Sequence, residues 1–219
     1  MGYRTRVKIC GITTREDAWT AIELGADAVG FLVGLLYASE DALTGADAGK
    51  LVEHVSPFVS ATLVTHRANL AEVRKLVREV APQVVQLHGP YPIDQIPALR
   101  DSCPAVKVIK AVHVTGDDSI GAAVDAARYA DAVLLDSKTA TRIGGTGVTH
   151  DWALSRKIRE TLAPTPVILA GGLTAANVAQ AIETVEPYAV DVNSGVSIRR
   201  GKKSRTLIEE FMRAAKRSR

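Results

Sequence analysis

The chain has 219 residues, of which 47% are hydrophobic and 23% are charged, and its formal net charge is only +3. These values are typical of a globular α/β protein, and they argue against a disordered or fibrous chain. The longest apolar runs, such as AVLLD, have the length of a strand and are too short to cross a membrane, and the stretch MGYRTRVKIC lacks the apolar core of a signal peptide. We therefore expect one domain over residues 1–219, in the cytoplasm and without a membrane partner.

The two cysteines and five histidines show no metal-ligand spacing. Cys10 and Cys103 also lie in unlike contexts, so we expect neither a disulfide framework nor a metal site. Basic residues gather in RRGKKSR and RAAKRSR near the C-terminus. We interpret these stretches as solvated helix ends, because no aromatic residues alternate with the charges, and nucleic-acid binding is the weaker alternative.

In chain order, short apolar segments alternate with segments of helical periodicity. The strands are expected at 6–10, 28–33, 58–64, 84–87, 106–112, 132–136, 167–170 and 189–192. The helices are expected at 15–24, 46–55, 70–80, 92–100, 118–128, 152–162, 175–185 and 205–216. Crossovers of helix length between nearly continuous apolar strands favour a parallel sheet covered by helices.

Eight such units favour a closed (β/α)8 or TIM barrel of the α/β class, although the chain is shorter than the typical ~250 residues of that fold. A doubly wound open sheet is the competing architecture. It normally carries a glycine-rich turn after the first strand, where this chain reads CGIT.

Two stretches near the end of the chain, PVILAGGLT (166–174) and YAVDVNSGV (188–196), each lead from an apolar strand into a turn of small residues and then a predicted helix. Such turns leave backbone N–H groups unpaired, and together with the helix dipole these groups favour an anion. The phosphate site of a TIM barrel commonly follows strands 7 and 8. We therefore expect Gly171, Gly172, Ser194 and Gly195 to bind phosphate, the alternative being that these residues only turn the chain.

Polar side chains end or follow most of the predicted strands: Cys10, Thr65, His66, His88, His113, Asp136, Asp191 and Asn193. In a barrel these strand ends share one mouth. A thiolate at Cys10 is a candidate base, and Asp136 is a candidate acid if a dry mouth raises its pKa. The alternatives are that Cys10 is a small core residue and that Asp136 caps a turn.

Six short motifs occur in a fixed order: KICGIT (8–13), QLHG (86–89), LLDS (134–137), GGTG (144–147) followed by DW, ILAGGL (168–173), and DVNSGV (191–196) followed by GKK. In this combination the chain resembles the phosphoribosylanthranilate isomerase family over nearly its whole length. The resemblance implies a TIM barrel that performs an Amadori rearrangement in tryptophan biosynthesis, with no metal and no organic cofactor. It also implies a phosphorylated aminosugar as substrate, and a monomer or homodimer.

The resemblance implies that Cys10 is the general base and Asp136 the general acid. Asp136 would protonate the furanose ring oxygen to open the ring to a Schiff base, and the Cys10 thiolate would remove the C2 proton. The glycine and serine turns would hold the 5′-phosphate, with Gly145 in a loop that closes over it. Lys8, Gln86 and Asp191 would line the mouth, as substrate contacts or as structural residues.

The loop after the second strand departs from the family. The family usually carries S-P-R there, and its arginine is associated with the anthranilate carboxylate, whereas GLLYASEDALT (34–44) has no basic residue and contains Glu40 and Asp41. We expect Arg67 or Arg142 to supply the missing cation. One alternative is an isomerase of the same mechanism that uses this acidic loop to receive a neutral or cationic aglycone. A barrel that binds a phosphorylated ligand without catalysis is the other.

Overall fold

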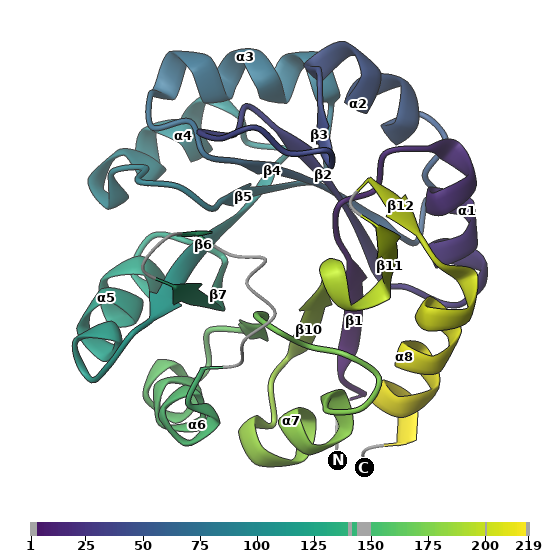
Figure 1. Cartoon of the computed structure of the whole chain (residues 1–219). Helices are drawn as coiled ribbons and strands as arrows, with labels where there is room; N and C mark the ends of the chain where they lie inside the picture. The colour runs from purple at the N-terminus through teal and green to yellow at the C-terminus, as the bar shows by residue number, and fades with distance from the viewer. Residues whose placement is uncertain (1–3, 140–141, 144–149, 200, 218–219) are drawn as a thin grey trace.

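The computed structural model describes residues 4–139, 142–143, 150–199 and 201–217. Within these ranges eight parallel strands form a closed barrel surrounded by helices (Figure 1). β1 pairs with both β2 and β10, which closes the ring and confirms the predicted TIM barrel. The barrel strands are β1 (Arg6–Ile9), β2 (Ala28–Val33), β4 (Ser60–Thr65), β5 (Val84–Leu87), β6 (Lys107–Val114), β7 (Ala132–Thr139), β9 (Val167–Leu169) and β10 (Ala189–Val192).

The helices between the strands lie close to their predicted positions. They are α1 (Arg15–Glu23), α2 (Gly45–Val52), α3 (Leu70–Val80), α4 (Ile96–Ser102), α5 (Asp118–Ala127), α6 (Trp152–Leu162), α7 (Val178–Val185) and α8 (Arg205–Arg217), and a short 3-10 helix, η1 (Ile93–Gln95), precedes α4. Thr14, Asn69 and Asp151 cap the starts of α1, α3 and α6 by accepting backbone N–H groups. None of the described helices is long and apolar enough to span a membrane.

Several short elements at the mouth of the barrel were not predicted. They are β3 (Ala42–Leu43), which pairs with β2, β8 (Arg142–Ile143), which pairs with β7, the 3-10 helix η2 (Ser194–Val196), and the antiparallel hairpin of β11 (Ser197–Arg199) and β12 (Lys202–Lys203). The helix predicted at 205–216 is confirmed as α8. A 3-10 turn and a hairpin intervene before α8.

Alternation along the strands divides their side chains between two environments. Val7 and Ile9 pack in the large core between the barrel and the helices, whereas Lys8 and Cys10 have the opposite parity and face inward. A smaller buried cluster fills the barrel interior with Ile109, Ala111, Ala132, Leu134, Ile168, Ala170 and Ala189. The last inward residue of each strand thus reaches the C-terminal mouth of the barrel, where TIM-barrel sites lie.

Candidate active site

A cavity of about 420 Å³ opens at the C-terminal ends of the barrel strands. This volume lies within the usual range of small-molecule sites, about 300 to 1,000 Å³. Most of the site residues expected from the sequence line it together, although they come from different strands. They are Cys10, Gln86, Asp136, Gly171, Gly172, Asp191 and Ser194.

The other expected residues have different positions. Lys8 lies deeper in the barrel, where it is 4% exposed and binds Asp191. Arg67 is not among the residues that line the cavity, and its guanidinium pairs with Glu72 at 3.4 Å. Gly145 and the side chain of Arg142 lie outside the described part of the structure.

Cys10 follows β1 and is buried against β2. Gly30 of β2 leaves room for the sulfur, because a Cβ at that position would lie 2.8 Å from Sγ. Burial raises the pKa of the Cys10 thiol, and the positive charges of Lys8 and Lys203 act in the opposite direction. The thiolate required of a base therefore depends on these two buried ammonium groups.

Lys8 and Asp191 form an ion pair of 2.7 Å between β1 and β10. Burial alone would lower the pKa of Lys8, but the charge of Asp191 and the adjacent Cys10 outweigh it, so that the pKa is raised. The ammonium group thus remains charged beneath Cys10. The Oδ1 atom of Asp191 is buried and accepts no hydrogen bond from the described residues. Because Asp191 also lines the cavity, Oδ1 is an available acceptor for a ligand hydroxyl.

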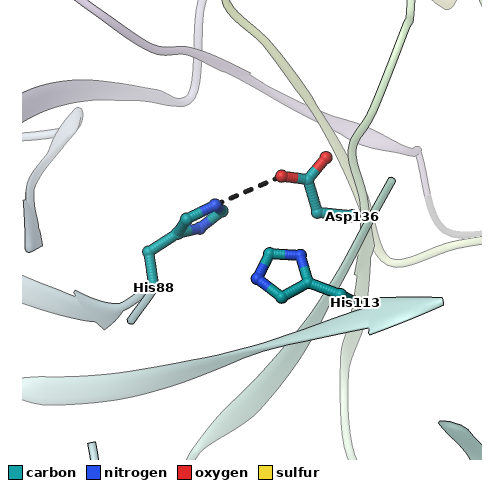
Figure 2. A group of neighbouring side chains, drawn as sticks. All are labelled: His88, His113 and Asp136. Atoms are coloured by element: carbon teal, nitrogen blue, oxygen red, sulfur yellow. Dashed lines mark ion pairs between the residues drawn. The ribbon is translucent and has the colours of Figure 1, made fainter. Parts of the chain in front are cut away.

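Asp136 of β7 is bound to His88, which follows β5 (Figure 2). Its Oδ2 lies 3.2 Å from Nε2 of His88, and its Oδ1 accepts the N–H of Ser137 at 2.8 Å. Burial alone would raise the pKa of Asp136, but the hydrogen bond from His88 and the charges of His88 and His113 outweigh it, and the pKa is lowered. The expectation that the mouth raises this pKa is wrong, because it did not include the two histidines.

The imidazoles of His66, His88 and His113 form a row beside Asp136. The ring of Tyr37 adjoins the His66 end of this row. Successive ring centroids are separated by 5.1 Å from Tyr37 to His66, by 5.6 Å from His66 to His88 and by 5.4 Å from His88 to His113. Burial and the charges of the other two histidines lower the pKa of His66 to about 4, so this ring is neutral near pH 7. The sequence shows these three histidines only as residues at strand ends. Their occurrence at the ends of three consecutive barrel strands is the signal that predicts the row.

His88, His113 and Asp136 present the donor types of a divalent metal site, with one atom of each within 4.8 Å of the others (Figure 2). Sequence spacing predicted no metal site because the three residues come from three different strands. The hydrogen bond between His88 and Asp136 accounts for their contact without an ion.

The two expected phosphate turns offer unpaired backbone donors. Gly171 and Gly172 have φ of +85° and +66°, and the N–H groups of these glycines and of Ser194 bind no acceptor among the described residues. A Cβ on Gly171 would lie 2.9 Å from Oδ1 of Asp136, so only glycine permits this close approach to the acid. Asn177 shapes the first turn by donating to the carbonyl of Gly172 at 3.0 Å. The turns are thus suited to an anion.

The acidic loop after β2 has a structural role that the sequence did not reveal. Asp41 is 8% exposed, and its carboxylate accepts the N–H of Gly201 at 2.5 Å and Nδ2 of Asn193 at 3.1 Å. These bonds join the loop between β2 and β3 to β10 and to the hairpin. Glu40 is exposed and does not line the cavity. The arrangement therefore weakens the interpretation of this loop as a receptor for a cationic aglycone.

Comparisons with known proteins agree with this geometry. Residues 7–214 match the family model of N-(5'phosphoribosyl)anthranilate (PRA) isomerase. The chain is 44% identical to N-(5'-phosphoribosyl)anthranilate isomerase of Methanocella arvoryzae, covering 95% of this chain and 96% of that protein. It is 43% identical to the protein of the same name from Halobacterium salinarum, covering 96% and 95%.

Solved structures give the same result. The phosphoribosyl anthranilate isomerase of Thermotoga maritima is 37% identical, with a TM-score of 0.84 over 97% of this chain and 98% of that one. Another phosphoribosyl anthranilate isomerase structure, a complex with reduced 1-(o-carboxyphenylamino)-1-deoxyribulose 5-phosphate, is 34% identical with a TM-score of 0.80, again over 97% and 98%. This chain therefore belongs to the phosphoribosylanthranilate isomerase family.

Proposed function

We propose that this protein is a phosphoribosylanthranilate isomerase of tryptophan biosynthesis. It converts N-(5-phosphoribosyl)anthranilate into 1-(2-carboxyphenylamino)-1-deoxyribulose 5-phosphate by an Amadori rearrangement. The observation that carries the proposal is one cavity lined by a cysteine, an aspartate and two turns with unpaired N–H groups. A relative with the same fold binds a reduced form of this product, which supports the choice of substrate.

Asp136 and His88 act together as the acid. Because the pKa of Asp136 is lowered, the aspartate alone is ionised near neutral pH, and the proton for the reaction is shared with Nε2 of His88. Transfer of this proton to the furanose ring oxygen breaks the C1–O bond, while the nitrogen lone pair forms the C1=N bond of the Schiff base. Gln86, whose Nε2 lies 3.1 Å from Nδ1 of His88, orients the imidazole.

Cys10 acts as the base in the second step. Its thiolate removes the C2 proton, and the electron pair of the C2–H bond forms the C1=C2 bond of an enolamine while the π pair of the C1=N bond moves to nitrogen. The enolamine then tautomerises to the ketone. The positive charge of Lys8, deeper in the barrel, stabilises the thiolate. Oδ1 of Asp191 accepts a hydrogen bond from a sugar hydroxyl, while its Oδ2 remains bound to Lys8.

The 5′-phosphate binds to the turns of Gly171 and Gly172 and of Ser194 and Gly195, and the loop containing Gly145 completes the site. We further propose that residues 1–219 form one domain, that the protein acts in the cytoplasm, and that it is a monomer or a homodimer. Pairing between the first and the last barrel strands supports a single domain.

The proposed function is tested by complementation of a tryptophan auxotroph that lacks this isomerase, together with a fluorescence assay of phosphoribosylanthranilate consumption by the purified protein. We expect growth without tryptophan and measurable turnover. A folded wild-type protein that neither supports growth nor consumes the substrate would show that the aglycone is different or that the barrel is not catalytic.

A further inference from the structure

The described residues that line the cavity offer little positive charge to the substrate proposed above. Three carboxylates line it, and each already has a partner: Asp41 binds backbone and amide donors, Asp136 binds His88, and Asp191 binds Lys8. The substrate adds a phosphate and a benzoate carboxylate to this set. The backbone turns can bind the phosphate, but burying the carboxylate without a partner would be strongly unfavourable, because the charge would lose its hydration with nothing to replace it.

Within the described part of the chain, Arg199 is the only lysine or arginine that lines the cavity. It ends β11, is exposed, and forms no ion pair or hydrogen bond through its side chain with the rest of the described structure. The buried ammonium groups nearby are already used, since Lys8 binds Asp191 and Lys203 binds Asn193 and Ser197. The guanidinium of Arg199 is therefore available to an anionic ligand.

Arg199 belongs to the hairpin of β11 and β12, which begins at the second phosphate turn and extends toward the loop after β2. The hairpin leaves η2 and extends over β1, the strand between β10 and β2 in the barrel (Figure 1). Its tip contacts that loop, because the N–H of Gly201 binds Asp41 and a Cβ on Gly201 would lie 2.8 Å from the carbonyl oxygen of Glu40. Tyr37 and Ser39 of the same loop line the cavity there. Arg199 lies two residues before Gly201 in this hairpin and is therefore near the loop after β2.

We propose that Arg199 binds the carboxylate of the anthranilate ring and thereby determines the preference for a carboxylated aglycone. The proposal rests on the proposed function. A guanidinium can bind a carboxylate through two parallel hydrogen bonds, which gives both affinity and orientation. Of the two arginines expected from the sequence, Arg67 does not line the cavity and already pairs with Glu72, and the side chain of Arg142 lies outside the described part of the structure.

Two ligands that differ only in the carboxylate test this assignment by calorimetry. One is the reduced product 1-(o-carboxyphenylamino)-1-deoxyribitol 5-phosphate, and the other is its phenylamino analogue, which lacks the carboxylate. We expect Arg199→Ala to weaken binding of the first ligand by roughly 10- to 150-fold, as for the loss of one charge-assisted contact, and to change binding of the second less than about 2-fold. The KM for phosphoribosylanthranilate should rise by a similar factor with little change in kcat, and Arg199→Lys should restore part of the loss.

Lys202→Ala is the matched control, because it removes the same charge from the same hairpin at a side chain that does not line the cavity. It should leave both affinities unchanged. Equal losses for both ligands in Arg199→Ala would assign the arginine to the phosphate and overturn the proposal. Wild-type affinity for both would also overturn it, as would a carboxylate-specific loss in Arg67→Ala instead. In each of these cases the wild type still turns over phosphoribosylanthranilate, whereas failure of the proposed function removes wild-type turnover itself.

Discussion

At the scale of single residues, we propose that Cys10 and Asp136 carry the two proton transfers. Replacing Cys10 by Ala or Asp136 by Asn should each lower kcat by about 100-fold or more, because each variant loses one positioned proton acceptor or donor. Binding of the reduced product should change little, since neither side chain supplies the main anion contacts. Steady-state kinetics and calorimetry on the same preparations measure both effects. Near wild-type turnover in either variant would remove that residue from the mechanism.

The contact between His88 and Asp136 has a consequence for the pH profile. The pair must hold one proton to act as an acid, so activity declines as the pH rises through the pKa of the pair. In His88→Gln the pKa of Asp136 should rise, because the hydrogen bond from His88, which does most to lower it, is absent. A carboxyl group nevertheless ordinarily loses its proton at lower pH than an imidazole does. The alkaline limb of kcat/KM should therefore move to lower pH, and the rate at pH 7 should fall about 10-fold or more.

The pH dependence of kcat/KM, measured between pH 5 and 9, distinguishes this role from a structural one. A variant that merely loosens the site would lose rate equally at every pH. His54→Gln is the control, because His54 is exposed on the outer surface and should leave the profile unchanged. A lower rate with an unshifted alkaline limb would contradict the shared-proton role of His88.

At the scale of elements, the loop between β2 and β3 and the hairpin of β11 and β12 form one unit through Asp41. Asp41→Ala removes two partly buried hydrogen bonds to a charged group, and we expect it to destabilise the protein by about 2 to 4 kcal/mol. Glu40→Ala, at the adjacent exposed position, should stay within about 0.5 kcal/mol. Urea unfolding measures both changes. Equal stabilities of the two variants would mean that Asp41 does not tie the loop to the hairpin.

The sequence predicted the regular elements well and the mouth of the barrel only in part. The barrel strands are recognisable because each is a short apolar run, and their bounds agree with the structure within about three residues. The elements β3, β11 and β12 have only two or three residues each, too few to produce a periodic pattern. Their positions depend on contacts such as the one between Asp41 and Gly201, which are 160 residues apart. For the same reason Arg199 was not predicted as a site residue.

The histidine row shows the corresponding limit for electrostatics. Each histidine was visible as a strand end, but a pKa depends on the neighbours that the barrel brings together. The sequence therefore predicted the position of Asp136 in the mouth but the wrong direction for its pKa.

At the scale of the whole molecule, closure of the barrel and the chemistry of its mouth depend on the same ion pair. Lys8 of the first strand and Asp191 of the last barrel strand are paired in the strand register and also through their side chains. Both are buried, and Cys10 lies at the next inward position after Lys8. A change at Lys8 should therefore affect the stability of the barrel and the ionisation of the thiol together.

Lys8→Met should destabilise the protein by about 3 to 5 kcal/mol, because it leaves the carboxylate of Asp191 buried without its partner. The double variant Lys8→Met/Asp191→Leu should recover much of this loss, since a well-packed apolar pair avoids the desolvation of both charges. Denaturant unfolding of the wild type, the two single variants Lys8→Met and Asp191→Leu, and the double variant measures these stabilities.

The double variant should nevertheless remain almost inactive. Lys8 is the largest of the influences that lower the pKa of Cys10 against the effect of burial, so that without it the pKa rises further and less thiolate forms at pH 7. Alkylation of Cys10 by iodoacetamide should accordingly require higher pH in both Lys8 variants than in the wild type, with Cys10→Ala as the control for reaction at Cys103. If the double variant regained both stability and turnover, the ion pair would serve only to close the barrel, and the thiolate would need another source of stabilisation.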